Sequence, residues 1–316
     1  MPHDPGDQVF HLEAHGYEAD VAARGATLVS LRFLGRDLIL PVASADRDDA
    51  PYRAPDFRGA VLAPWPGRLA DGRFTWHGTP HDVGIDEPGR RTALHGRVWS
   101  QVFVPRAASS VAVHLAATLD DAIDYPGALE FEVIASLTAS GLVHRIRVTH
   151  RGEESAPVGW GVHPYLLAGH ASPGAVDGWR AAIPAARVMT MTPDRLLPEP
   201  VRPAEGDLDL RAAPALGSRR LNHAFTALAR DRDGNAHASL TGPSGDTVTL
   251  TLGKGYRWLQ AYTSDESAGN DRRAALALEP MTCPPDALHS GTDLLTLEPG
   301  ESASASFTIA AIRADR

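Results

Sequence analysis

The chain has 316 residues, of which 43% are hydrophobic and 22% charged, and its formal net charge is −9. This composition is ordinary for a soluble globular protein, and we expect one domain spanning residues 1–316. The negative charge argues against a nucleic-acid partner, and no run of eighteen apolar residues predicts a membrane span. Residues 1–16 are polar and lack the pattern of a signal peptide. The single cysteine, Cys283, excludes an internal disulfide and, with the missing signals, favours a cytoplasmic location.

Polar and apolar residues alternate over much of the chain, which is typical of half-buried antiparallel strands. The alternating segments are 110–119, 129–141, 142–152 and 247–253. The 29 glycines and 25 prolines fall mostly between such runs, with turn signals at 34–37, 70–73, 232–235 and 242–246. Helical patterns are weak, because 104–110 has no helical period and 208–221 contains a proline. Short strands separated by turns predict an all-β fold, a large antiparallel β-sandwich.

The first segment with a candidate site residue is "VLAPWPGRLADGRFTWHG", residues 61–78. Prolines on both sides of Trp65 and the following Gly67 indicate a rigid turn that could direct Arg68 toward a ligand. Asp71 and Gly72 then predict a hairpin. The alternative is a hairpin that carries an ordinary surface arginine.

Two further segments carry histidines beside glycines and aromatic residues. In "IDEPGRRTALHGRVW" (85–99), His95 precedes a glycine, so its ring could lie where two backbones approach closely. In "GWGVHPYLLAG" (159–169), His163 precedes a proline, which favours extended backbone, and Trp160 and Tyr165 flank it. Histidine suits proton transfer near neutral pH. Each histidine could equally be structural.

The fourth segment is "ALALEPMTCPPDALHSG", residues 275–291. An apolar run that predicts a buried strand ends on Glu279. Partial burial would raise the pKa of this carboxyl group and make its anion more basic, which suits a general base. The alternative is a solvated carboxylate at a strand end. Cys283 could be a nucleophile, although a free cysteine is more often a small buried hydrophobe.

Other chemistries fit the sequence less well. The chain has no close metal-binding pair such as HxH or HExxH, no GxSxG elbow and no phosphate-binding GxxxxGK[ST] loop. His163 and His170 are seven residues apart in a segment expected to be a loop, so a zinc site is a weak alternative. We therefore expect neither a metal nor an organic cofactor.

Taken together, the segments resemble the aldose 1-epimerase family, whose members are also called galactose mutarotases. The similar segments, in family order, are "PWPGRLADGRFTWHG", "EPGRRTALHG", "DYPGALEFEVIASLT" (124–138), "GWGVHPYLLAG", "LNHAFTAL" (221–228), "LALEPMTCPPDALHSG" and the closing strand pair "LTLEPGESASASF" (295–307). Each motif is weak alone, but their order along nearly the whole chain is specific.

The resemblance implies a galactose-mutarotase-like fold, a β-supersandwich with the sugar in a cleft on one sheet. It implies an isomerase that interconverts the α and β anomers of a free hexose, with Glu279 as general base and His163 as general acid. Arg68 and His95 would bind and polarise the sugar. The aromatic residues Trp65, Trp160 and Tyr165 could offer an apolar face to the sugar ring, or could belong to the core.

Two departures from the family pattern concern specificity. Asn222 replaces an aspartate that accepts hydrogen bonds from sugar hydroxyls in many members, and an amide has an acceptor oxygen without the charge. His223 could contribute instead. Gly67 replaces an asparagine, which removes a polar side chain. Neither change touches the expected acid–base pair.

The expected partner is a small aldose, and the chain would act as a monomer or a homodimer. One alternative is an epimerase of a phosphorylated or otherwise anionic hexose, with Arg90, Arg91 and Arg97 near His95 as candidate anion ligands. Another is a non-catalytic sugar-binding protein of the same fold. That protein would not need both Glu279 and His163.

Overall fold

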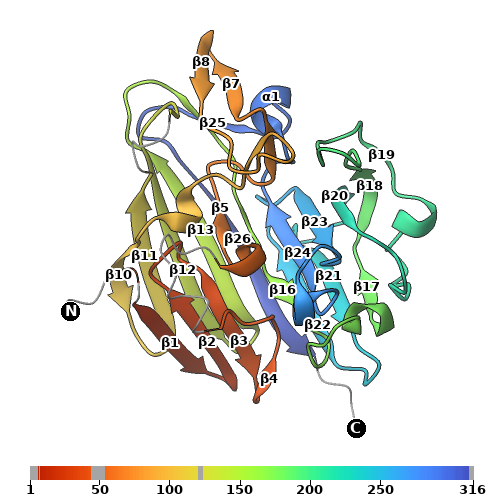
Figure 1. The fold of residues 1–316 in the computed structure, drawn as a ribbon. Helices are drawn as coiled ribbons and strands as arrows, with labels where there is room; N and C mark the ends of the chain where they lie inside the picture. Colours follow the sequence, from red (N-terminus) through yellow and green to blue (C-terminus); the bar gives the residue numbers. More distant parts are fainter. Residues whose placement is uncertain (1–5, 7, 44–53, 120–123, 313–316) are drawn as a thin grey trace.

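The structure is a computed structural model that describes residues 6, 8–43, 54–119 and 124–312 (Figure 1). Part of the N-terminal stretch used in the sequence argument, residues 1–5 and 7, lies outside this range. The described residues form mainly β-strands and, besides short 3-10 turns, one four-residue α-helix, α1 (Ala287–Ser290). No helix in them is long and apolar enough to cross a membrane. The 3-10 turns are η3 (Pro55–Phe57), η4 (Val98–Ser100), η5 (Ala175–Gly178), η6 (Gly206–Leu208) and η7 (Gly269–Asp271).

One eight-stranded antiparallel sheet forms the long layer of the molecule (Figure 1). The chain enters it at one edge, makes a meander of four strands, and returns later to complete the other edge. In spatial order its strands are β10 (Val104–Ala108), β11 (Ala112–Thr118), β12 (Leu129–Thr138), β13 (Gly141–His150), β26 (Ser302–Ile312), β22 (Thr247–Leu252), β21 (Ala236–Thr241) and β17 (Arg180–Ala182).

A second sheet supplies most of the candidate site. In spatial order its strands are β19 (Arg202–Pro203), β18 (Ala185–Met189), β20 (Asn222–Leu228), β23 (Trp258–Tyr262), β24 (Leu276–Met281), β15 (Gly161–Val162) and β5 (Val61–Leu62), and β16 (Tyr165–Leu166) also pairs with β24. Strand β24 lies inside this sheet, between β23 and β15, and all six of its residues are buried.

The remaining strands form smaller units. A four-stranded sheet consists of β1 (Val9–Ala14), β2 (Tyr17–Ala22), β3 (Leu28–Phe33) and β4 (Arg36–Asp37). Three strand pairs are β6 (Arg68–Ala70) with β9 (Thr92–Leu94), β7 (Arg73–Trp76) with β8 (Thr79–Asp82), and β14 (Ala156–Val158) with β25 (Leu295–Leu297). The β7–β8 hairpin projects from the top of the molecule in Figure 1.

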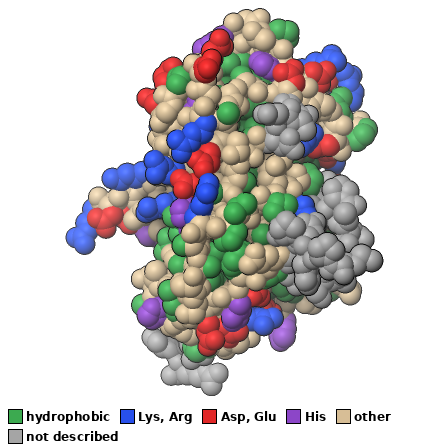
Figure 2. All heavy atoms as spheres, turned by 90° about the vertical axis from the view of Figure 1, so that its left-hand side faces the viewer, with side chains coloured by type: hydrophobic (Ala, Val, Ile, Leu, Met, Phe, Trp, Pro, Cys, Tyr) green, Lys and Arg blue, Asp and Glu red, His purple; other side chains and the backbone are tan. Residues whose placement is uncertain are grey.

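The core lies between these layers. Strands β1 and β2 contact β11 and β12, so the four-stranded sheet covers one end of the long sheet. The largest cluster of buried apolar side chains joins all three layers, through residues such as Leu12, Phe131 and Leu278. Burial of apolar surface is the main force that holds such layers together. The face shown in Figure 2 carries basic and acidic side chains interspersed, without a continuous basic stripe over its described part.

The four strands predicted from alternation are present as β11, β12, β13 and β22. In β12 buried and half-buried residues alternate without exception, and β22 alternates in the same way. Residues 104–108 form strand β10, which agrees with their lack of helical period. Segment 295–307 gives two strands, but these pair with different partners, β25 with β14 and β26 with β13 and β22.

The prediction of a hairpin at Asp71 and Gly72 is wrong. A turn does occur there, but the strand before it, β6, pairs with β9, and the strand after it, β7, pairs with β8. The hairpin turn of this region is at His77 and Gly78. A DG pair specifies the local turn geometry, whereas strand pairing depends on residues farther along the chain.

Candidate active site

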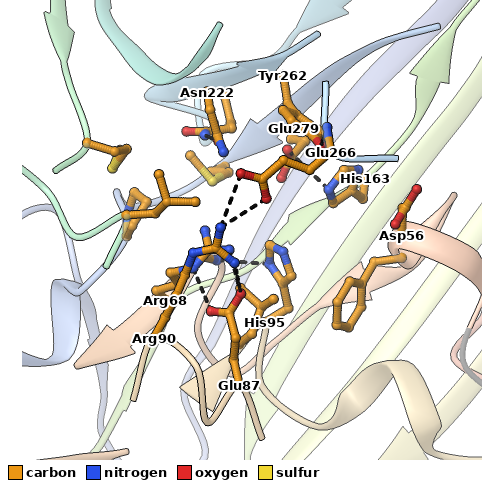
Figure 3. A pocket seen from close by; sticks show the side chains of 18 of the residues that line it. Asp56, Arg68, Glu87, Arg90, His95, His163, Asn222, Tyr262, Glu266 and Glu279 are labelled. Atoms are coloured by element: carbon orange, nitrogen blue, oxygen red, sulfur yellow. Dashed lines mark hydrogen bonds and ion pairs between the residues drawn. The ribbon is translucent and has the colours of Figure 1, made fainter. Parts of the chain in front are cut away.

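A cavity of about 310 Å³ opens beside strands β20, β23 and β24, and the loops around β6 and β9 close its other side (Figure 3). Its size is at the lower end of typical small-molecule sites. The structure brings six of the seven sequence-predicted site residues to its wall: Arg68, His95, His163, Tyr165, Asn222 and Glu279.

Glu279 lies within β24 and is 3% exposed. Burial raises the pKa of its carboxyl group to about 8, while the positive charge of Arg68 acts in the opposite direction. The sequence predicted partial burial of this side chain, and the structure buries it almost completely. A strand covered on both sides holds a carboxyl group away from water, in a position where it can exchange a proton with a ligand.

His163 follows β15 and is also buried. Its Nε2 lies 3.3 Å from Oε1 of Glu279, and its ring stacks on Tyr165 with a centroid separation of 4.8 Å. Burial lowers the pKa of His163 to about 3. Because burial favours the neutral form of both partners, the Glu279–His163 pair holds one shared proton at neutral pH. One proton acceptor and one proton donor are thus available at the same point.

His95 follows β9 and contacts His163 edge to face, with ring centroids 5.5 Å apart. The backbone N–H of Gly67 donates to Nδ1 of His95 at 3.0 Å. A ring nitrogen that accepts a hydrogen bond carries no proton, so the neutral ring carries its proton on Nε2. Gly67 therefore contributes to the site through its backbone N–H, which fixes the His95 ring.

Within the described residues, ligand atoms of His95, His163 and Glu279 lie within 4.8 Å of one another, a spacing that could hold a metal ion. The hydrogen bonding of His95 does not suit this role. Its Nδ1 is occupied by the Gly67 N–H, and its Nε2 bears the proton. Two ligands then remain, fewer than the three protein ligands usual at a catalytic zinc site. His95 is better suited to donate a hydrogen bond into the cavity.

Arg68 opens β6 and its guanidinium binds Glu87, with Nε–Oε2 2.7 Å and Nη2–Oε1 2.9 Å. Thr92 also donates to Glu87, at 2.6 Å. Burial opposes ionisation of Glu87, but the hydrogen bonds from Arg68 and Thr92 outweigh it and lower the pKa to about 2. The loop after β24 supports the strand of Arg68, because the Asp286 N–H donates to the Arg68 carbonyl at 2.8 Å. Arg68 is therefore fixed rather than mobile.

The arginines proposed as anion ligands differ in position. Arg90 lines the cavity and binds Glu87 at 2.9 Å and Glu266 at 2.9 and 3.2 Å. In Figure 3 its bond to Glu266 runs across the view between Arg68 and Glu279. Arg91 is exposed and pairs with Asp71, and Arg97 pairs with Asp86 and does not line the cavity. Among the three, only Arg90 is placed to meet a ligand in this cavity.

Trp160 does not join the other predicted residues. It is 1% exposed, belongs to the main apolar cluster and is absent from the cavity wall. Trp65 is also buried, in a smaller cluster beneath β6 and β9, where it stacks near Tyr125. Both tryptophans have the core role that the sequence left open. Tyr165 lines the cavity and packs against His163.

Several cavity residues were missed by the sequence analysis: Asp56, Glu87, Gln260, Tyr262 and Glu266. Gln260 had a usable signal, because it is a polar residue inside the buried strand "WLQAY", the same anomaly that drew attention to Glu279. Glu87 lies in segment 85–99, where the sequence pointed to His95 and not to Glu87. Asp56 lies in the 3-10 turn η3 and Glu266 in a turn after β23, and no local pattern specifies where such connecting segments lie in space.

The structure has a cavity of small-molecule size with a buried carboxyl–imidazole pair in its wall, and comparison with known proteins gives the family of the chain. The sequence profile of the family described as Aldose 1-epimerase matches residues 8–310, so the chain belongs to that family. A curated relative, "Uncharacterized protein YihR" of Escherichia coli K12, is 30% identical over 304 residues, covering 96% of this chain and 92% of the relative.

Solved structures show the same fold. The GalM/aldose epimerase homologue from C. elegans superposes with a TM-score of 0.82 at 15% identity, covering 98% of this chain and 99% of the other. Galactose 1-epimerase from Lactobacillus acidophilus NCFM gives a TM-score of 0.78 at 17% identity, covering 96% and 93%. At such low identity the likeness establishes the fold: the protein has the galactose-mutarotase-like β-supersandwich.

Proposed function

We propose that the protein is an aldose 1-epimerase, which interconverts the α and β anomers of a free hexose. The observation that carries this proposal is the 3.3 Å contact between Glu279 and His163, both buried in the cavity wall. Ring opening removes a proton from the C1 hydroxyl and adds one to the ring oxygen. These two oxygens share one carbon, so the groups that serve them must also lie close together.

The reaction needs one proton acceptor and one proton donor. The pair reacts in the form in which the shared proton has passed from Glu279 to Nε2 of His163, across their 3.3 Å contact. Glu279 then takes the proton of the C1 hydroxyl while His163 delivers its proton to the ring oxygen, and the C1–ring oxygen bond breaks to give the open aldehyde. Rotation about C1–C2 exposes the other face of the aldehyde. The ring then closes as His163 recovers its proton and Glu279 returns the other. Each group contributes on the order of 10²–10⁴-fold.

Two neighbouring residues complete the proposed site. His95 donates from Nε2 to a sugar oxygen, because its Nδ1 is held by Gly67. Arg68, fixed by Glu87, supplies positive charge next to Glu279 and favours the anionic form of that carboxyl group during the reaction. The proposed assignments therefore place hydrogen-bond donors on the β6 and β9 side of the cavity, across from strands β20, β23 and β24.

Polarimetry tests the proposal, with freshly dissolved α-glucose and α-galactose as substrates. The wild type is expected to accelerate the approach to anomeric equilibrium, and Glu279→Gln and His163→Ala are expected to lower the rate by at least a hundredfold. If mutarotation with the wild type is no faster than in buffer for every aldose, the proposed enzymatic activity is wrong and a sugar-binding protein is favoured. Full activity in Glu279→Gln would remove the base assignment.

A second candidate function is epimerisation of an anionic hexose, which one observation favours. Arg90 lines the cavity, and its Nη2 is bound at 2.9 Å by the carboxylate of Glu266, whose side chain is 61% exposed. A phosphate or other acidic group on the sugar could replace the Glu266 carboxylate on this guanidinium. Rates on glucose and glucose 6-phosphate, measured side by side, separate the two functions. Activity on the phosphate alone, lost in Arg90→Met, would establish the second.

A further inference from the structure

Strand β6, which begins with Arg68, pairs with β9 along one edge, and its other edge has no strand partner among the described residues. On the paired edge, the His95 N–H donates to the Gly67 carbonyl at 2.9 Å. In an antiparallel pair, alternate residues direct their backbone groups to opposite sides. Arg68 and Ala70 therefore direct their backbone N–H and carbonyl groups away from β9, to the unpaired edge.

Asp286 binds this unpaired edge at two points. Its backbone N–H donates to the Arg68 carbonyl at 2.8 Å, and the Ala70 N–H donates to its Oδ1 at 2.9 Å. These two bonds supply one donor and one acceptor, as a neighbouring strand would, and backbone groups removed from water are nearly always paired in this way. One of the two bonds depends on the carboxylate, so the side chain of Asp286 helps to fix the backbone of β6.

The carboxylate of Asp286 is itself held in place. Asp286 precedes α1 with a left-handed backbone, φ 58°, a conformation that Asp and Asn adopt more readily than most residues. Nδ1 of His289 lies 2.8 Å from its Oδ1, and the Asp286 side chain is only 17% exposed. Leu288, in the same short helix, packs in the buried cluster that contains Leu69 of β6. Asp286 is therefore a fixed attachment point for β6.

The loop that carries Asp286 joins the two halves of the candidate site. Glu279 lies in β24 and Arg68 in β6, and no strand pairing among the described residues joins these two strands directly. The loop after β24 makes the connection. Pro285 packs on Gly67, where an added Cβ would lie 2.7 Å from the proline ring, and the next residue, Asp286, binds β6. The position of Arg68 relative to Glu279 thus depends on this loop.

We propose that Asp286 is a positioning residue, whose carboxylate holds the backbone of β6 so that the Arg68 guanidinium stays next to Glu279. Asp286 does not line the cavity, so it acts through Arg68 and not on the sugar. Glu87 fixes the other end of Arg68, through two hydrogen bonds to the guanidinium. This inference rests on the proposed function, since it takes Arg68 and Glu279 as groups that act on the sugar.

The test uses two substitutions that suit a left-handed backbone. Asp286→Asn keeps an oxygen that accepts from the Ala70 N–H, and Asp286→Gly removes that oxygen without backbone strain. Asp293→Gly is the matched control. Asp293 also has a left-handed backbone, φ 51°, and its carboxylate, 25% exposed, accepts from the Trp258 indole N–H at 2.8 Å. Its hydrogen bonds in the described structure are not to β6, and it does not line the cavity.

Mutarotation of α-glucose is measured for each variant, alone and combined with Arg68→Met. Asp286→Gly is expected to lower kcat/KM by about threefold to tenfold, mainly through kcat, because Arg68 acts on charge that develops during the reaction. Asp286→Asn and Asp293→Gly should stay within about twofold of the wild type, and Asp286→Gly should cost less than about twofold once Arg68 is replaced.

Three results would overturn the inference. An equal loss from Asp286→Gly with and without Arg68 would mean a general structural role. An equal loss in Asp286→Asn and Asp286→Gly would mean that the bond to Ala70 is not the link. No loss in Asp286→Gly would mean that β6 keeps its position without the carboxylate.

A second measurement does not depend on catalysis. The ionisation of the Glu279 carboxyl group is followed with pH by infrared difference spectra, taken between each protein and the same protein with Glu279→Gln. Displacement of Arg68 removes positive charge near Glu279, so the ionisation should move to higher pH in Asp286→Gly, as in Arg68→Met, and stay in place in Asp286→Asn. If the wild type accelerates no sugar, the proposed function fails, and this titration still decides the inference. An unmoved titration in Asp286→Gly overturns it.

Discussion

Gly67 and His95 hold each other through two reciprocal hydrogen bonds. The Gly67 N–H donates to the ring Nδ1 of His95 at 3.0 Å, and the His95 N–H donates to the Gly67 carbonyl at 2.9 Å. Both residues have positive φ, 72° and 62°, a conformation that is costly for any residue other than glycine. The pair fixes the tautomer and the position of the His95 ring, so Gly67 is part of the structural basis of the site.

Substituting Gly67 with alanine is expected to impair activity. A Cβ there would lie 2.7 Å from a side-chain carbon of Pro285, and the left-handed backbone disfavours alanine in addition. The backbone must shift, and His95 moves with it. We expect kcat/KM for mutarotation to fall by about ten- to a hundredfold. Gly35→Ala is the matched control, because Gly35 has φ 77° but no atom within 4 Å of the added Cβ. Equal activity of the two variants would contradict this role.

The pH dependence of the reaction should reflect the pair Glu279–His163. One shared proton is needed, and it is present between the lowered pKa of about 3 for His163 and the raised pKa of about 8 for Glu279. Raising the pH through about 8 removes that proton, so kcat/KM should fall on the alkaline side. Lowering the pH toward about 3 adds a second proton and abolishes the acceptor. Buffer-corrected polarimetry across this range measures both limbs. A rate that keeps rising above pH ~8 would exclude the pair as the acid–base couple.

The same raised pKa predicts that Glu279→Gln stabilises the fold. The carboxyl group ionises at its ordinary pKa of 4.5 in the unfolded chain but at about 8 in the folded protein. Between these values the unfolded state binds fewer protons, so wild-type stability decreases as the pH rises through this window. Glutamine has no such proton, and the variant should gain a few kcal/mol relative to the wild type as the pH rises. Urea unfolding at about pH 5 and about pH 8 measures the difference. A constant difference between the two proteins would show that the carboxyl group is not shifted in this direction.

The sequence could predict the fold class and most of the site, for identifiable reasons. Strands β12 and β22 alternate because each has one face on the core, and this period is visible in the residues themselves. Glu279 and Gln260 are both polar residues inside buried strands, a contrast that local sequence reveals. Arg68, His95 and His163 also stood out in the local sequence, and the family resemblance implied their roles and added Asn222. Trp160, which was a candidate because it flanks His163 in the sequence, is a core residue.

What could not be predicted depends on contacts between distant segments. Arg90 binds Glu266, 176 residues away, and this contact decides which charges face the cavity. The pairing of β6 with β9 instead of β7 also requires a partner more than twenty residues farther on. Gly67 looked like the loss of a polar group, because its function resides in a backbone N–H that any residue possesses and in a backbone angle that few adopt.

Arg68 binds Glu87 and is close enough to Glu279 to influence its pKa. Replacing Arg68 should therefore change the pH profile in a defined direction. Its positive charge lowers the pKa of Glu279, against the larger effect of burial. In Arg68→Met this charge is lost, so the pKa of Glu279 rises further and the alkaline limb of the profile should move to higher pH. Activity at neutral pH should fall by about tenfold or more, because the anionic form of Glu279 becomes harder to reach.

Arg91→Met is the matched control for this experiment. Arg91 directly precedes β9, the strand that pairs with the β6 strand of Arg68, but its side chain is 71% exposed and pairs with Asp71 outside the cavity. The Arg91→Met variant should leave both the rate of mutarotation and its pH profile unchanged. If the alkaline limb moves to higher pH in Arg68→Met but not in Arg91→Met, the effect is due to the charge next to Glu279. Loss of activity with an unmoved limb would instead mean that Arg68 acts only on the substrate, because binding of a neutral sugar leaves the titration of the Glu279–His163 pair unaltered.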